Sequence, residues 1–217
     1  MKADIRLAGD RALVVELGDE ISAAVNGRVR AFCLALEARG ICGIVEIVPT
    51  YRSATVHYRP EEIARRALED EIRSAALEAG ESASSPARLV EIPVLYDGPD
   101  LAFVAQHANL SIAEVVRIHA GAEYLVHMLG FTPGFAYLGG MDARIATPRL
   151  TQPRTRIPAG SVGIAGAQTG VYPIDSPGGW QLIGRTHLKL YDPAQAHPFL
   201  LDVGDRVRFV PVEEGAS

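Results

Sequence analysis

Three arginines in the C-terminal half of the sequence could bind an anion. Arg154 and Arg156 are two residues apart in "PRTRIPAG", so on a strand both side chains would point to one face. Arg185 follows in "QLIGRT". The planar guanidinium group matches the geometry of a carboxylate or a phosphate. The sequence therefore predicts that these three arginines contact anionic groups of a ligand.

Neutral hydrogen-bonding residues and glycines lie near these arginines. Their side chains could orient an amide, and glycine lets backbone N–H groups approach a ligand closely. The substrate-binding candidates are therefore Arg154, Arg156, Gln168, Thr169, Tyr172, Ser176, Gly178, Gly179 and Arg185. The pocket-wall candidates come from "LGFTPGFAYLGG" and the only tryptophan: Phe131, Pro133, Phe135, Tyr137 and Trp180. The alternative is that the aromatic residues fill a core and the arginines lie in solvent.

Several common catalytic motifs are missing from the sequence. It contains neither a GxxxxGK(S/T) phosphate loop nor a GxGxxG turn before a helix. It contains no HExxH zinc motif and no GxSxG nucleophile elbow. The six histidines do not fall at metal-ligand spacing, so we expect no metal on this chain. No residue is an obvious general base, and the catalytic residues stay unassigned.

Residues 1–81 are expected to form an α+β domain with two layers. Two short β-type runs flank a turn at Gly9, and two more are broken at Pro49. One helix is predicted to end at Gly40, and a second to begin at Pro60 and to end at Gly80. Two helices packed on one face of a four-stranded sheet would bury its apolar side.

A different pattern begins after a small, polar segment at residues 82–88, which we interpret as a linker. A strand and two short helices come first, with Asp100 as a cap for one helix and a capping box of Ser111 and Glu114 for the other. Twelve of the 21 glycines then fall between Gly121 and Gly184. Short strands joined by such turns indicate a β-barrel or sandwich over residues 89–217.

The composition excludes several classes of protein. The 217 residues are 48% hydrophobic, which argues against disorder, and the net charge of −5 argues against a nucleic-acid partner. No apolar run approaches the ~20 residues that span a bilayer. The charged N-terminus does not resemble a signal peptide, so we expect a cytoplasmic protein with no membrane contact.

Three long motifs resemble one protein family. They are "LGFTPGFAYLGG", "PRTRIPAGSVGIAGAQTGVYPIDSPGGWQLIGRT" and "GDRVRFVP". The family holds the B subunit of 5-oxoprolinase, Kip-type kinase inhibitors and proteins called allophanate hydrolase subunit 1, and the resemblance covers nearly the whole chain. It implies an α+β N-terminal domain followed by a mainly-β, cyclophilin-like barrel.

The resemblance also implies a function. Such a B subunit acts with a homologous C subunit and an A subunit in an ATP-dependent 5-oxoprolinase, which hydrolyses the lactam of 5-oxoproline to L-glutamate. The complex would use ATP, and the chain would be inactive alone. Two alternatives stay open: an inhibitor that binds a sensor histidine kinase, and half of a urea/allophanate-type, biotin-dependent carboxyltransferase.

Overall fold

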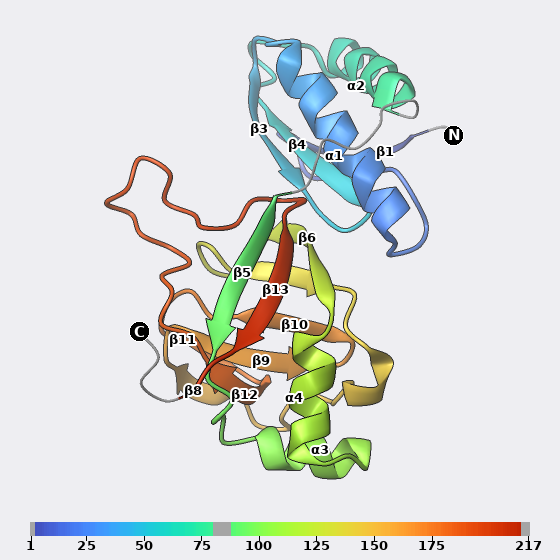
Figure 1. The fold of residues 1–217 in the computed structure, drawn as a ribbon. Coiled ribbons are helices and arrows are strands. Elements are labelled where there is room, and N and C mark those ends of the chain that lie inside the picture. Colours follow the sequence, from blue (N-terminus) through green and yellow to red (C-terminus); the bar gives the residue numbers. More distant parts are fainter. Residues whose placement is uncertain (1–2, 80–87, 214–217) are drawn as a thin grey trace. The chain divides into compact units, whose positions relative to one another are not determined.

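The structure is a computed structural model that describes residues 3–79 and 88–213. The chain divides into two compact units, Met1–Pro86 and Ala87–Ser217 (Figure 1). Of the predicted linker, 82–88, all but the last residue lies outside the described residues. The exact domain boundaries at 81 and 89 stay a prediction.

The first unit contains an antiparallel sheet of four strands. The order is β1-β2-β4-β3, and the bounds are β1 (Asp4–Leu7), β2 (Ala12–Glu16), β3 (Ile44–Pro49) and β4 (Ser53–Tyr58). The turn between β1 and β2 contains Gly9 at φ +75°, a left-handed conformation that glycine adopts without strain. The four predicted strands are therefore confirmed.

Two helices, α1 (Ala23–Ala38) and α2 (Arg65–Ala79), bury their apolar sides with one face of this sheet. Val15 and Val56 from the sheet share a single buried cluster with Phe32 of α1 and Ile72 of α2. Alternate residues of β4 are buried, as expected for a sheet covered on one side. The predicted two-layer α+β architecture is confirmed.

The predicted start of α2 at Pro60 is wrong. The helix begins at Arg65, because the preceding residues form a turn in which the N–H groups of Glu62 and Ile63 both donate to the Arg59 carbonyl. The Glu62 carboxylate also pairs with the Arg59 guanidinium at 2.9 Å. The acidic residues after Pro60 therefore stabilise a turn and not the first turn of a helix.

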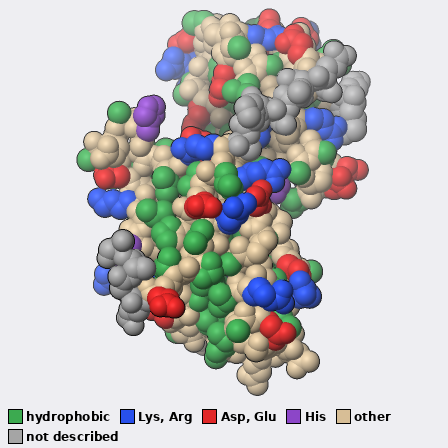
Figure 2. Space-filling model, viewed as in Figure 1, with side chains coloured by type: hydrophobic (Ala, Val, Ile, Leu, Met, Phe, Trp, Pro, Cys, Tyr) green, Lys and Arg blue, Asp and Glu red, His purple; other side chains and the backbone are tan. Residues whose placement is uncertain are grey.

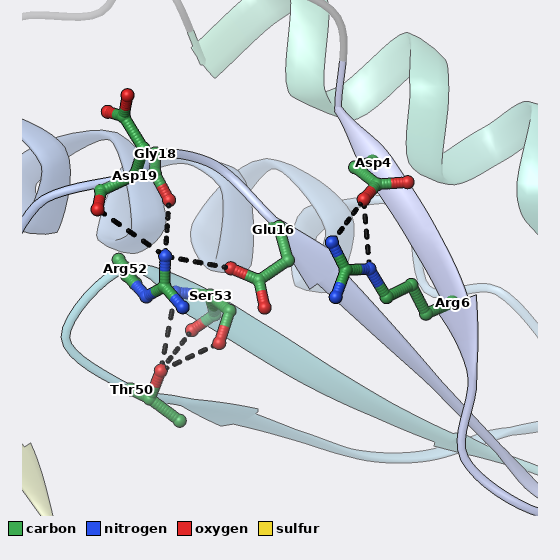
Figure 3. Close-up of polar contacts among 8 residues, drawn as sticks. All are labelled: Asp4, Arg6, Glu16, Gly18, Asp19, Thr50, Arg52 and Ser53. Carbon is green, nitrogen blue, oxygen red and sulfur yellow. Dashed lines mark hydrogen bonds and ion pairs between the residues drawn. The ribbon is translucent and has the colours of Figure 1, made fainter.

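Arg52, in the turn between β3 and β4, fastens the connection from β2 to α1 (Figure 3). Its Nη1 donates to the carbonyl oxygens of Gly18 at 3.4 Å and Asp19 at 3.5 Å, and lies 3.7 Å from a carboxylate oxygen of Glu16. Figure 3 shows Arg6 pairing with Asp4 on β1, separately from the Arg52 contacts. Both clusters are solvent-exposed, so their role is to shape loops and not to build the core.

The second unit is a nearly closed barrel. Its seven-stranded sheet has the order β12-β9-β10-β7-β6-β13-β5, with β5 and β13 parallel and the other pairs antiparallel. The bounds are β5 (Leu89–Val94), β6 (Glu123–Leu129), β7 (Ala136–Gly139), β9 (Ser161–Ala165), β10 (Gln168–Val171), β12 (Gln181–Arg185) and β13 (Arg206–Pro211). Leu95 and Arg185 exchange two backbone hydrogen bonds of 2.9 Å, which bring the two outer strands together. The predicted mainly-β barrel is confirmed.

Short elements complete this unit. Strands β8 (Arg154–Ile157) and β11 (Ser176–Gly178) pair separately, and a 3-10 turn, η1, spans Ala143–Ile145. Helix α3 (Leu101–Ala108) contacts β12, and α4 (Ile112–Ala120) contacts β13 (Figure 1). The capping box of Ser111 and Glu114 at α4 is confirmed.

The side-chain cap predicted for α3 is wrong. The Asp100 side chain makes no capping hydrogen bond. Its carboxylate instead accepts from the Leu182 N–H at 2.7 Å and from Arg154 Nη2 at 2.8 Å. Two partners from distant strands replace the local one, because a charge-assisted pair stabilises a half-buried carboxylate more than one neutral N–H does.

One face of the second unit carries a patch of hydrophobic side chains over β5 and β13 (Figure 2). Leu89 of β5 is 43% exposed. Contiguous apolar surface of this kind is typical of a protein–protein contact. Within the ranges 3–79 and 88–213, no helix is both long and apolar enough to cross a membrane.

Candidate functional site

A cavity of about 250 Å³ opens in the barrel unit beside a small aromatic core cluster. Seven of the residues that line it are candidates from the sequence: Phe131, Phe135, Tyr137, Tyr172, Gly178, Gly179 and Trp180. Three more were not predicted: Arg149, Pro153 and Pro177. The lining is mostly apolar with few polar groups, as is usual for small-molecule sites.

The aromatic wall is organised around Phe135. Its ring packs edge-to-face against four others, with centroid distances of 5.6 Å to Phe131, 5.1 Å to Tyr137, and 5.4 Å to both Tyr172 and Trp180. Edge-to-face packing adds stability beyond the burial of the rings and fixes their orientation. The wall is therefore rigid before any ligand binds.

Phe131 lies at the cavity in an unusual conformation. Its φ is +68°, in the left-handed region that bulky residues avoid, and its side chain is 61% exposed. A tight turn imposes this angle: the Thr132 N–H donates to the Gly130 carbonyl and the Phe135 N–H to the Thr132 carbonyl. Strain of this kind clusters at ligand-binding loops.

Tyr172 supplies a polar group within the aromatic wall. Burial raises the pKa of its hydroxyl, while a hydrogen bond from the backbone N–H of Trp180 and the positive charges of Arg149 and Arg154 oppose that rise. The hydroxyl therefore stays protonated at neutral pH and can donate. A Cβ on Gly178 would touch this hydroxyl, so glycine is needed there to leave it room.

The three arginines predicted to bind anions are paired with carboxylates of this chain. Arg154 pairs with Asp100 at 2.8 Å and Arg185 pairs with Asp97 at 2.8 Å. Arg156 is exposed and pairs with Asp175 at 2.6 Å. None of the three lines the cavity. Their predicted contact with a ligand stays a prediction.

Four other candidates also lie outside the cavity lining. Pro133 is exposed and Gln168 is half-buried. Ser176 is buried, and its Oγ has no hydrogen-bond partner among the described residues. Thr169 is fully buried, and its hydroxyl donates to the Gly163 carbonyl at 3.0 Å. Their roles in substrate binding stay predictions.

A buried polar network surrounds Thr169. Its Oγ1 lies 2.8 Å from Nε2 of His119, and Nδ1 of His119 lies 2.7 Å from the Tyr96 hydroxyl. The ring of His119 stacks on Phe209 with centroids 4.5 Å apart. Burial lowers the pKa of His119 to about 3, so the imidazole is neutral. In the described part of the chain, no group of three His, Cys, Asp or Glu residues is placed to hold a metal ion.

Arg149 is the cavity residue that sequence reasoning missed. Its side chain makes no ion pair or hydrogen bond with residues 3–79 or 88–213. Pro153 and Pro177 belong to motifs that the sequence analysis singled out. Arg149 instead stands in "ATPRL", which has no glycine, aromatic residue or periodic pattern to mark it.

Comparison with known proteins identifies close relatives. Residues 3–201 match the family model described as carboxyltransferase domain, subdomain C and D. The chain is 44% identical to the B subunit of 5-oxoprolinase from Bacillus subtilis, over 99% of this chain and 95% of that protein. It is 46% identical to the B subunit of 5-oxoprolinase from Escherichia coli O157:H7, over 99% of this chain and 98% of that protein.

Solved structures agree with the fold. A conserved uncharacterized protein from Pyrococcus horikoshii is 46% identical, with a TM-score of 0.57 over 97% of this chain and 98% of that chain. The Kluyveromyces lactis urea carboxylase is 24% identical, with a TM-score of 0.79 over 98% of this chain and 22% of that chain. At that identity the second likeness concerns the fold alone.

Proposed function

This chain belongs to the carboxyltransferase family, subdomains C and D, and to the branch that holds the B subunits of 5-oxoprolinase, and we propose that it is the B subunit of an ATP-dependent 5-oxoprolinase. The observation that carries the proposal is the identity of 44% and 46% to two such subunits, over nearly the full length of each chain. The reaction is hydrolysis of the lactam of 5-oxoproline to L-glutamate.

In this proposal the chain works with a homologous C subunit and an A subunit. The hydrophobic patch over β5 and β13 supports a protein partner (Figure 2). The cavity lining supports it in another way, because it contains no carboxylate, histidine or lysine that could act as a general base. Groups from a partner would complete the site, so the chain alone is inactive.

The cavity does not fit ATP. Arg149 is the one charged residue in its lining, whereas a triphosphate is bound by several cations and backbone N–H groups. We therefore place ATP on another member of the complex. The cytoplasmic location expected from the sequence stays a prediction of this proposal.

This chain would hold the lactam and exclude water from it. The rings of Phe135 and Trp180 form an apolar wall for the substrate, and the Tyr172 hydroxyl can donate a hydrogen bond to an amide oxygen. Donors aimed at an oxygen that gains negative charge lower the barrier to attack on a carbonyl. The backbone beside Gly178 and Gly179 lies within reach of the same ligand.

Reconstitution tests the proposal. The purified chain is mixed with its C and A partners, 5-oxoproline and ATP, and glutamate release is measured with each component omitted in turn. We expect glutamate only in the complete mixture. The absence of glutamate from a complete mixture of folded, associated subunits would contradict the proposal.

The carboxyltransferase alternative has weaker support. The urea amidolyase of Lachancea kluyveri is 28% identical, and this chain covers 13% of its length. A biotin-carrier domain bound to the complex would favour that alternative over the lactam reaction.

A further inference from the structure

The charges around the barrel single out one arginine. Arg154, Arg156 and Arg185 each have a carboxylate partner within 2.8 Å. Arg149 has no such partner in the part of the chain that the structure describes. It lines the cavity, whereas the three paired arginines do not. The free cation is therefore located where a ligand can reach it.

The chemistry of the lining defines the ligand further. Aromatic faces and prolines make up most of the wall, and no acidic residue belongs to it. Such a lining favours a compact apolar body that carries a negative charge, because a single unpaired guanidinium beside low-dielectric walls attracts anions strongly. A cavity of about 250 Å³ holds a small molecule and not a peptide.

Arg149 also acts on the one polar side chain of the wall. Burial raises the pKa of Tyr172, and the charge of Arg149 is among the effects that oppose this rise. The guanidinium is therefore within electrostatic reach of the Tyr172 hydroxyl. A ligand that fills the cavity can meet a cation and a neutral donor at the same time.

We propose that the cavity binds a small cyclic carboxylate, with the carboxylate on Arg149 and the ring against Phe135 and Trp180. The Tyr172 hydroxyl donates to a polar group of the ring. The identification of this ligand as 5-oxoproline rests on the proposed function, whereas recognition of a ring carboxylate rests on the cavity alone.

The only tryptophan of the chain, Trp180, reports directly on this cavity. The full chain is titrated with 5-oxoproline while tryptophan fluorescence is recorded, and calorimetry provides a second readout. We expect saturable binding. The same ring without its carboxylate, 2-pyrrolidinone, is expected to bind roughly 10-fold more weakly or worse, since a charged hydrogen bond is lost.

Two variants test the role of the guanidinium. Arg149→Gln is expected to weaken 5-oxoproline binding by roughly 10-fold or more and to leave 2-pyrrolidinone binding unchanged, since the two changes remove the same contact. Arg144→Gln is the matched control, because Arg144 is exposed, pairs with Asp142 and lies outside the cavity lining. It is expected to bind like the wild type.

Three results would overturn the inference: no saturable binding by either readout, equal affinity for the two ring compounds, or unchanged affinity in Arg149→Gln. These outcomes are separable from failure of the proposed function. Binding with no glutamate release from the complete complex would contradict the enzyme assignment and keep the carboxylate site. Glutamate release with no effect of Arg149 on binding would do the reverse.

Discussion

The carboxylate of Asp100 holds the guanidinium of Arg154, with 2.8 Å between Oδ1 and Nη2. The other carboxylate oxygen accepts from the N–H of Leu182 at 2.7 Å. Asp100 therefore ties the start of α3 to β8 and β12 at once. The side chains of Asp100 and Arg154 are 13% and 30% exposed, so this pair is better shielded from water than the Arg185–Asp97 pair.

Replacing Asp100 tests whether this pair stabilises the barrel. Asp100→Ala leaves a buried N–H and a half-buried guanidinium without their acceptor, so we expect the free energy of unfolding to fall by about 2 kcal/mol. Asp97→Ala removes a pair that is about half exposed and should cost at most ~1 kcal/mol. Urea denaturation of both variants gives the comparison. Equal losses would show that the shielding of Asp100 has no energetic effect.

Two adjacent glycines should differ in their tolerance of alanine. At Gly178 a Cβ would contact the Tyr172 hydroxyl and lie 2.8 Å from Cδ1 of Ile157. We expect Gly178→Ala to lower the free energy of unfolding by about 1–3 kcal/mol, as overpacking does. At Gly179 the nearest atom is 3.6 Å away, an ordinary contact. Thermal denaturation of the two alanine variants should therefore separate them, and equal melting temperatures would contradict the packing.

Thr169→Val removes a hydroxyl without changing the shape of the side chain. Since this hydroxyl donates to Gly163, its oxygen accepts from Nε2–H of His119, and Nδ1 accepts from Tyr96. The variant leaves two buried groups unpaired, so we expect a loss of about 1–3 kcal/mol in unfolding free energy. An increase in KM of the complete enzyme with unchanged stability would instead support the substrate contact predicted from sequence.

The buried His119 makes stability depend on pH. Burial lowers its pKa from 6.5 to about 3 in the folded protein. Below about pH 6.5 the unfolded chain binds a proton that the folded protein does not, so the free energy of unfolding falls by up to ~1.4 kcal/mol per pH unit towards pH 3. Above pH 6.5 this contribution does not change. NMR titration of His119 is the direct measurement, and a titration midpoint close to 6.5 would contradict the burial effect.

Local signals in the sequence predicted local structure well. The capping box of Ser111 and Glu114 spans three residues and is present at α4. The strands around Gly9 follow from alternation and one turn. Asp100 shows the limit, because its partners are 54 and 82 residues away and outcompete the helix N–H groups that follow it. Such competition has no local signature.

The candidate site was predicted in part for the same reason. The aromatic and glycine motifs that line the cavity are dense enough to stand out in the sequence. The arginines were harder to assign, since a guanidinium looks the same in the sequence whether a carboxylate neutralises it or not. Asp97, Asp100 and Asp175 occupy three of them, and only the folded chain shows that Arg149 stays free of such a partner among the described residues.

The most direct test of the account measures kcat/KM for 5-oxoproline in the complete enzyme assembled with Arg149→Gln. If the cavity of this chain is the substrate site, kcat/KM falls roughly 10-fold or more, mainly through KM, while Arg144→Gln behaves like the wild type. A fully active Arg149→Gln enzyme would contradict the account and move the substrate to another member of the complex.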